Sequence, residues 1–214
     1  NENQWYVEPC VGGANVIDKV TGNRIGSDLN FYLISLLIAI QRGWEPPGIV
    51  SELDYNNIKN DKLEYDPELV GFVGIGCSFA SKWFGGYARG ENNKGERRNY
   101  ARENRDNILA QAPNLQGIIF KCCDYLELKI PDNSIIYCDP PYANTTKYKS
   151  SFNAGEFWLW CDAKVAEGHS VFVSEYSAPN DWKCVWEKPV NSQLTYTRKS
   201  TGNKQAIEKL FIKQ

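Results

Sequence analysis

Several residue types that often carry function are scarce in this sequence. It has no methionine, a single histidine (His169), and seven cysteines that include no CxxC pair. An odd cysteine count without that spacing predicts neither a disulfide framework nor a zinc site. Most of the cysteines lie in apolar runs, namely Cys77, Cys122, Cys123 and Cys138. They indicate reduced core thiols of an intracellular protein. Because no initiator methionine is present, we expect a fragment or a chain whose leading residues are missing.

Long apolar runs and a strong net charge are also absent. The longest apolar stretch, residues 31–40, is interrupted by Ser35 and is too short to span a bilayer. The polar, acidic start does not resemble a signal peptide. A net charge of −2 gives no general attraction to a polyanion, so nucleic-acid binding would need a local basic patch.

The bulk composition is otherwise that of a globular protein. With 214 residues and 42% hydrophobic content, the chain is long enough for one sizeable core and a small inserted lobe. Aromatic residues make up 13% and include 7 Trp and 12 Tyr. Such residues fill cores, but they also stack on nucleic-acid bases.

The most informative stretch is residues 134–142. An apolar run with β-branched residues ends in Asp139, Pro140, Pro141 and Tyr142, which predicts a buried strand that stops at a rigid turn. In open α/β sheets, ligands bind at the carboxyl ends of strands. An Asp-Pro pair alone also fits a solvated strand exit, but the four residues together favour a functional site.

A second candidate corner lies near the start of the chain. Residues 4–8 predict a strand, residues 9–13 a turn containing Gly12 and Gly13, and residues 14–20 a helix. This order is typical of nucleotide-binding α/β units, although a Gly-Gly pair also occurs in simple tight turns. Asp28 ends the next predicted strand, where it would either hold ribose hydroxyls or cap the helix beginning at Leu29 or Asn30.

The remaining pattern alternates helices and strands. Helices are predicted at residues 31–41, 51–60 (capped by Ser51), 66–76, 97–111 (ended by Pro113) and 156–167. Strands are predicted at residues 117–123, 134–138 and 171–174, followed by antiparallel hairpin structure around 184–187, 194–197 and 206–212, with a turn at 201–203. His169 precedes a strand and is predicted to be a loop residue, because no triad is recognisable around it.

Residues 76–105 are locally basic, aromatic and rich in glycine. The basic members are Lys82, Arg89, Lys94, Arg97, Arg98, Arg102 and Arg105, and the aromatic ones are Trp83, Phe84, Tyr87 and Tyr100. This composition predicts an inserted lobe that contacts DNA. A solvated loop and helix face is the alternative, because Glu91, Glu96 and Glu103 offset part of the charge.

The Asp139-Pro140-Pro141-Tyr142 motif, preceded by the glycine corner at residues 9–13, resembles the Dam-like (D12) class of adenine-N6 DNA methyltransferases, most nearly the phage or prophage versions. The resemblance implies a Rossmann-like α/β methyltransferase fold with a mostly parallel sheet and an antiparallel C-terminal strand. It also implies a catalytic domain at 1–42 and 113–214, an inserted target-recognition lobe at 43–112, and a place in the cytoplasm of a bacterial host cell.

The resemblance assigns roles to particular residues. It implies that S-adenosylmethionine is bound by Glu8, Pro9, Cys10, Gly12, Gly13, Asp28, Asp124, Tyr125 and Asp139, with Cys10 standing where the family usually has Phe. Catalysis falls to Asp139, Pro140, Pro141 and Tyr142. We expect double-stranded DNA to be bound by Lys82, Trp83, Tyr87, Arg89, Arg97 and Arg98. Family members also open with a segment that closes over the cofactor, and this sequence begins directly at the first strand.

The residue types suit the chemistry. The Asp139 carboxylate and the Pro140 carbonyl can each accept a hydrogen bond from N6 of adenine, and the prolines hold these acceptors in place. Tyr142 offers a face for a flipped base, and no metal is required. Two rival functions stay open at this point. One is methylation of RNA adenine or protein glutamine, and the other is DNA binding by a catalytically silent relative.

Overall fold

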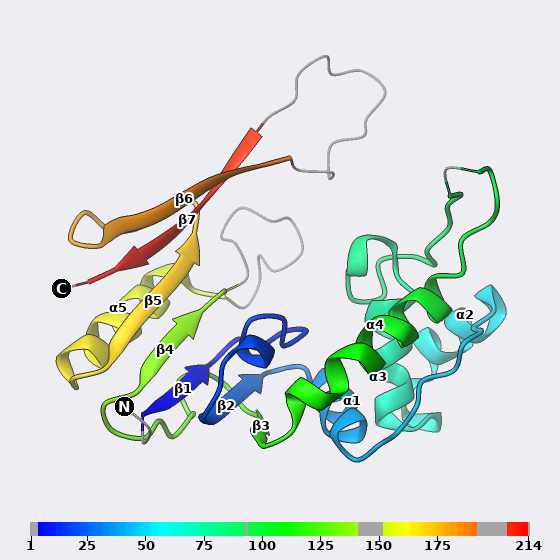
Figure 1. Ribbon diagram of the computed structural model, residues 1–214, viewed down its shortest axis with the longest axis horizontal. Coiled ribbons are helices and arrows are strands. Elements are labelled where there is room, and N and C mark those ends of the chain that lie inside the picture. Colours follow the sequence, from blue (N-terminus) through cyan, green and yellow to red (C-terminus); the bar gives the residue numbers. More distant parts are fainter. Residues whose placement is uncertain (1–3, 93, 141–151, 192–204, 214) are drawn as a thin grey trace. The chain divides into compact units, whose positions relative to one another are not determined.

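The computed structural model describes residues 4–92, 94–140, 152–191 and 205–213 (Figure 1). The chain divides into two compact units, which we call the terminal unit (Asn1–Cys10 with Tyr125–Gln214) and the central unit (Val11–Asp124). The described strands form one seven-stranded sheet in the order β3-β2-β1-β4-β5-β7-β6, and both units contain helices. The predicted Rossmann-like α/β class is confirmed. The division into a catalytic domain and a recognition lobe at residues 43–112 stays a prediction.

The terminal unit contributes one end of the strand order. Its described elements are β1 (Trp5–Glu8), β4 (Ile135–Cys138), α5 (Ala154–Ala166), β5 (Ser170–Glu175), β6 (Lys183–Asn191) and β7 (Gln205–Ile212). Strand β4 pairs in parallel with β1 and β5, whereas β7 runs antiparallel to β5 and β6 (Figure 1). The predicted antiparallel C-terminal strand is therefore confirmed. The strand predicted at 194–197 and the turn at 201–203 lie outside the described residues.

The side chains of β4 alternate between the two faces of the sheet, as the period of a strand requires. Ile136 and Cys138 are fully buried, whereas Ile135 and Tyr137 are only half-buried. A strand with one face fully inside the core has a strongly specified register, because a slip of one residue would expose that face. The position of the residue that follows β4 is therefore fixed.

Helix α5 packs an aromatic face into the core of the terminal unit. It begins after Asn153, whose side chain accepts hydrogen bonds from the backbone N–H groups of residues 155 and 156. Phe157, Trp160 and Cys161 are buried, and the thiol of Cys161 is hydrogen-bonded to that of Cys138. The helix predicted at residues 156–167 is confirmed, and it contacts the last residue of β4.

His169 is a buried structural residue in the loop before β5. Its Nδ1 accepts a hydrogen bond from the backbone N–H of Ser134 at 3.1 Å. The backbone N–H of Ser170 in turn donates to the carbonyl of Ser134 at 3.0 Å. These contacts tie together the amino ends of β4 and β5, the opposite end of these strands from Asp139. The prediction of a loop residue without a triad fits this placement.

The central unit is mostly helical. Its described elements are η1 (Ile17–Lys19), β2 (Asn23–Asp28), α1 (Phe31–Gln41), α2 (Glu52–Asn60), η2 (Lys62–Glu64), α3 (Pro67–Gly76), η3 (Phe79–Ser81), α4 (Tyr100–Leu115) and β3 (Ile118–Cys122). Strands β2 and β3 are parallel, with Asp28 paired to Cys122. Helices α1 and α3 pack closely at Gly71. A Cβ atom added at this glycine would lie 2.2 Å from the carbonyl oxygen of Tyr32, so no larger residue fits there without a shift of the backbone.

Three helices of the central unit begin or end where local signals predict. Helix α1 spans Phe31–Gln41. Helix α2 begins with a capping box in which the side chains and backbone N–H groups of Ser51 and Asp54 bond each other reciprocally. Helix α3 has Pro67 in its first turn, where a missing N–H is tolerated. These predictions are confirmed. They were possible from the sequence because each helix end depends on interactions within a few residues.

The helix predicted at residues 14–20 is wrong. The chain there forms only the short 3-10 turn η1, and Ala14 takes a left-handed φ of 58°. The β-branched residues Val16, Ile17 and Val20 have low helix propensity, and Ile17 is instead fully buried. The glycine corner therefore lacks the helix N-terminus that its sequence suggested.

Helix α4 also departs from the prediction. It begins at Tyr100 rather than at residue 97, and it runs through Pro113 to Leu115. Partners from outside the helix bond its last carbonyl groups: Arg24 donates to Asn114 at 2.9 Å, and Gln41 donates to Leu115 at 2.6 Å. Leu115 is also fully buried. Tertiary contacts thus outweigh the helix-breaking tendency of a proline in the last turn.

The cysteines divide between core and surface. Cys77 and Cys138 are buried as predicted, but Cys122 is exposed, so its prediction as a core residue is wrong. Cys122 is the last residue of the edge strand β3, where the packed part of that strand ends. No disulfide bond occurs among the described residues. Nor, over the same residues, is any helix both long and apolar enough to cross a membrane.

Candidate functional site

The exit of β4 brings acidic and phenolic groups to one edge of the sheet. Because β1 and β4 are parallel, with Val7 paired to Ile136, their carboxyl ends share that edge. Glu8 ends β1 and is buried, whereas Asp139 directly follows β4 and is exposed. Pro140 is buried beside it. Pro141 and Tyr142, which complete the predicted motif, lie outside the described residues.

Two tyrosines modify the electrostatics of this edge. The hydroxyl of Tyr6 donates to Glu8 Oε1 at 2.9 Å, and burial together with the Glu8 charge raises the pKa of Tyr6. Burial raises the pKa of Tyr137, and the charge of Asp139 raises it further. Tyr137 is also hydrogen-bonded to Ser174. Both phenols therefore stay neutral at physiological pH. The edge carries two carboxylates and suits a group with positive charge.

Asp28 in the central unit holds the glycine turn against the end of β2. Its Oδ2 accepts from the backbone N–H of Gly12 at 3.2 Å, and its Oδ1 accepts from that of Asn30 at 2.9 Å. Burial raises the pKa of Asp28, while these backbone donors act in the opposite direction. Gly12 has a left-handed φ of 48°, a conformation that favours glycine. The acid and the turn therefore form one rigid corner.

The possibility that Asp28 caps the following helix is wrong. Asn30 is the N-cap of α1, and its side chain accepts from the backbone N–H groups of Tyr32 at 3.1 Å and Leu33 at 3.3 Å. Asp28 lies two residues earlier, and its carboxylate accepts from the backbone N–H groups of Gly12 and of the N-cap residue Asn30 itself. The alternative role, as a ligand of ribose hydroxyls, stays a prediction.

The rest of the predicted cofactor set has varied environments. Pro9 is buried and Cys10 is half-buried after β1, while Gly13 is exposed and its carbonyl accepts from Gln111 Nε2 at 3.1 Å. Asp124 is half-buried two residues beyond β3. Tyr125 is buried in an aromatic cluster of the terminal unit, with ring centroids 5.6 Å from Phe157 and 5.2 Å from Trp160. The contacts of Tyr125 are those of a core residue.

The predicted DNA-binding residues all lie on one segment, residues 77–98, which we call the arm. At its base, an antiparallel bridge joins Ser78 to Tyr87, and near its tip a second bridge joins Glu91 to Arg97. Asn92 holds the turn at the tip, because its side-chain oxygen accepts from the backbone N–H groups of Lys94 at 2.9 Å and of residue 96 at 3.0 Å. The arm is thus a two-bridge hairpin rather than an unstructured loop.

The arm side chains fall into two groups. Trp83 is half-buried, with its ring stacked on that of Tyr32 at 5.8 Å, and the hydroxyl of Tyr87 donates to the carbonyl of Val50 at 2.8 Å. These two aromatic residues anchor the base of the arm. Lys82, Arg89, Arg97 and Arg98 are exposed.

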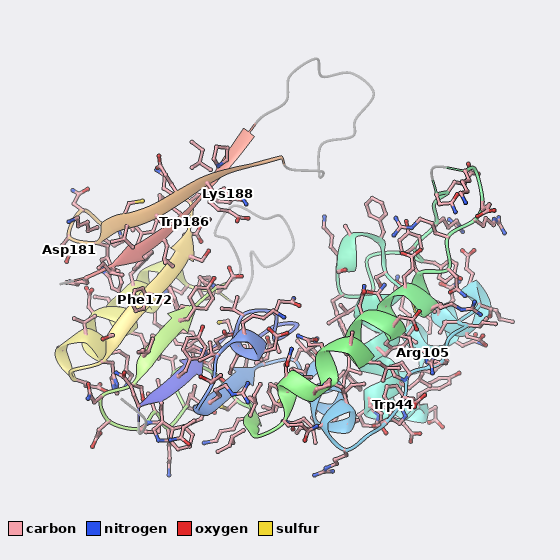
Figure 2. The ribbon with its side chains drawn as sticks, in the orientation of Figure 1. Trp44, Arg105, Phe172, Asp181, Trp186 and Lys188 are labelled. Carbon is pink, nitrogen blue, oxygen red and sulfur yellow. The ribbon has the colours of Figure 1, made fainter. Side chains whose placement is uncertain are left out.

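Some of the positive charge is paired within the central unit. Arg89 pairs with Glu52, and Arg98 pairs with Glu103 and lies over the ring of Tyr100 at 4.5 Å. Arg105, which is labelled in Figure 2, donates to Glu45 at 2.7 Å. In the described part of the chain, Lys82 and Arg97 have no ion-pair partner. Arg89 and Arg97 line a shallow hollow with Gly90 and Glu91. This hollow is a candidate phosphate contact.

Sequence reasoning missed Tyr55 on α2. It is 1% exposed, and its hydroxyl is hydrogen-bonded to Ser78 at the base of the arm. A buried tyrosine on a polar helix has the pattern of an ordinary core residue, so no sequence signal distinguishes it. Elsewhere, no cluster of His, Cys, Asp and Glu that could hold a metal ion occurs among the described residues.

Comparison with known families identifies the protein class. The family model of the D12 class N6 adenine-specific DNA methyltransferases matches residues 80–207, which is more than half of the chain. The chain therefore belongs to this family and is an adenine-specific DNA methyltransferase. The match includes most of the arm and the exit of β4, while Glu8, Gly12 and Asp28 precede it. No curated protein matches the sequence.

Proposed function

We propose that this enzyme transfers the methyl group of S-adenosylmethionine to N6 of an adenine flipped out of double-stranded DNA. The exit of β4 carries the proposal. There the exposed Asp139 carboxylate follows a fully buried strand residue, Cys138, and precedes a buried proline, Pro140. An acceptor held by backbone on both sides is suited to orienting an amino group, because little conformational freedom remains to be lost on binding.

The residues at the strand ends fit the proposed cofactor. S-adenosylmethionine, when bound, supplies a methyl group activated by a sulfonium charge. The carboxylates of Glu8 and Asp139 would favour that positive charge, and the corner formed by Asp28 and Gly12 would accept the ribose hydroxyls and leave room beside the glycine backbone. Pro9, Cys10, Gly13, Asp124 and Tyr125 complete the proposed cofactor set.

Asp139 and Pro140 would prepare the adenine for transfer. The N6 lone pair of adenine is delocalised into the ring, so N6 is a poor nucleophile. Hydrogen bonds from its two protons to the Asp139 carboxylate and the Pro140 carbonyl would draw N6 toward tetrahedral geometry. Its lone pair would then point at the methyl group. Pro141 would stiffen the turn that carries these acceptors.

The arm is our proposed DNA contact. Adenine N6 cannot be reached inside a duplex, so the base must leave the stack, and Tyr142 is proposed as the face on which it rests. Exposed Lys82, Arg89, Arg97 and Arg98 would bind phosphates, whereas Trp83 and Tyr87 would contribute mainly by shaping the arm. On the basis of the resemblance, we further propose a phage or prophage enzyme that acts in the cytoplasm of a bacterial host.

The test is a methyl-transfer assay with tritiated S-adenosylmethionine and unmethylated plasmid DNA. After hydrolysis of the DNA, we expect the label to elute with N6-methyladenine. Label on cytosine alone, or on RNA in a parallel reaction but not on DNA, would refute the proposal. A separate titration with S-adenosylmethionine identifies a silent relative, because such a protein would bind DNA without binding the cofactor.

A further inference from the structure

The base of the arm is held by a small set of backbone hydrogen bonds. The N–H of Phe79 donates to the carbonyl of Gly86 at 2.8 Å, and the N–H of Ala88 donates to the carbonyl of Cys77 at 2.9 Å. The residues between these bonds take conformations that cost free energy: Ala80, Ser81 and Phe84 have φ values of 53°, 52° and 43°. The arm therefore needs further contacts to hold its shape.

A hydrogen-bond chain through Tyr55 supplies such contacts. The hydroxyl of Ser78 donates to the carbonyl of Gly74 at 2.8 Å, so its only proton is already used. In the 2.9 Å contact between Tyr55 and Ser78, Tyr55 must then be the donor. The oxygen of Tyr55 in turn accepts from the backbone N–H of Gly86 at 3.1 Å. The chain has one direction, from Gly86 through Tyr55 and Ser78 to Gly74, and joins both strands of the arm to α3.

The ring of Tyr55 packs against the same segment. Its centroid lies 5.5 Å from that of Phe84 and 5.6 Å from that of Tyr87, and the residue is 1% exposed. Tyr55 thus contacts the arm at Ser78, Phe84, Gly86 and Tyr87. Its own helix, α2, also carries Glu52, the ion-pair partner of Arg89.

We propose that Tyr55 is a positioning residue for DNA binding: it sets the base of the arm, and thereby the position of the basic side chains near its tip. The proposal rests on the proposed role of the arm as a DNA contact. Tyr55 is buried and has no access to DNA or to the cofactor corner. Its removal should therefore weaken DNA binding and leave the methyl-transfer step itself unchanged.

The test is Tyr55→Phe, which removes the hydroxyl and keeps the ring. It leaves the N–H of Gly86 without its acceptor, so we expect the KM for unmethylated plasmid DNA to rise roughly ten-fold. The kcat and the KM for S-adenosylmethionine should stay within about two-fold of wild type, because Tyr55 has no access to the cofactor corner. A general loss of folded protein would not raise the KM for DNA alone. Tyr65→Phe is the matched control, because Tyr65 belongs to the same unit and lies outside this hydrogen-bond chain.

Hydrogen exchange and three further variants make the result decisive. Hydrogen exchange of peptides covering residues 79–88 should be faster in Tyr55→Phe than in wild type. If Tyr55→Phe does not fold, Ser78→Ala takes its place and should also raise the KM for DNA, because it removes the acceptor of Tyr55.

If Arg97→Ala raises the KM for DNA and Tyr55→Phe does not, the inference is wrong while the role of the arm stands. If Lys82→Ala and Arg97→Ala both leave that KM unchanged, the role of the arm fails first, and the inference falls with it.

Discussion

The exit of β4 and the arm are held by different kinds of interaction. At the exit of β4, the backbone is paired with parallel strands on both sides, and Ile136 and Cys138 are fully buried. In the arm, two isolated bridges and a few side-chain hydrogen bonds hold a segment with several left-handed residues. Loss of one exposed side chain should therefore disturb chemistry alone at the first place, whereas loss of one buried hydroxyl should disturb geometry at the second.

The largest expected effect is at the exit of β4. Asp139→Ala should lower kcat by about 10³-fold, because the proposed acceptor for N6 is lost. Since Asp139 is exposed, the free energy of unfolding should change by less than about 0.5 kcal/mol. Tritium transfer and urea unfolding measure the two quantities, and Asp132→Ala, at an exposed aspartate just before β4, is the control. A variant that keeps more than a tenth of wild-type kcat would remove Asp139 from the mechanism.

The next effect concerns the cofactor corner. Asp28→Ala removes the acceptor of the Gly12 and Asn30 N–H groups together with the proposed ribose ligand. We expect the Kd for S-adenosylmethionine to rise by about 10²-fold, because charge-assisted hydrogen bonds to the cofactor would be lost. Isothermal titration calorimetry gives this value. The control is Asp66→Ala, since the Asp66 side chain makes no capping bond. An unchanged Kd would show that Asp28 only supports the turn.

A smaller effect is expected in the arm, where the ion-paired Arg98 can be compared with Arg97, which has no ion-pair partner among the residues that the structure describes. Arg97→Ala should weaken binding to plasmid DNA by roughly ten-fold and reduce the salt slope of log K by about 1, as loss of one phosphate contact requires. Arg98→Ala should have a weaker effect, because Arg98 already pairs with Glu103 and lies over Tyr100. Binding measured between 50 and about 200 mM salt tests both. Equal effects would mean that these internal pairs do not limit DNA contact.

The smallest effect at neutral pH concerns Cys77. Its carbonyl accepts a hydrogen bond from the backbone N–H of Ala88 at the base of the arm. Burial raises the pKa of the Cys77 thiol from 9.0 to about 12. Between these values the unfolded chain loses the proton and the folded chain keeps it, so stability falls as pH rises, by about 1.4 kcal/mol per pH unit. Urea unfolding between about pH 9 and about pH 11 should show stability falling toward this slope in wild type and a shallower fall in Cys77→Ala. Identical slopes in wild type and Cys77→Ala would show that the Cys77 thiol does not cause this loss of stability with rising pH.

Predictions from the sequence succeeded where interactions are local. Ser51 with Asp54, and Pro67 in a first turn, place helices through contacts within one turn of the chain. They failed where a distant partner decides. Helix α4 passes through Pro113 because Arg24 and Gln41 bond its last carbonyl groups, and both come from far away in the sequence.

The candidate site divides in the same way. The short apolar run of β4 and the Asp-Pro pair after it are readable from composition and order, and β4 ends at Cys138 as expected. The helix expected after Gly13 did not form, because Ile17 is buried and Ala14 is left-handed. The low helix propensity of the β-branched residues is visible in the sequence, but the burial of Ile17 depends on packing partners that the sequence does not reveal.

The sequence by itself determined the α/β class, the strand that delivers Asp139, and the basic segment that became the arm. These depend on apolar periodicity, turn residues and local charge. Only the tertiary structure decided that Asp28 supports the glycine turn while Asn30 caps α1, and that Arg98 has an ion-pair partner where Arg97 has none among the described residues. It alone revealed Tyr55. The physical reason is that a hydroxyl acquires its role from the donors and acceptors that folding brings to it, and Ser78 and Gly86 are far from Tyr55 in the sequence.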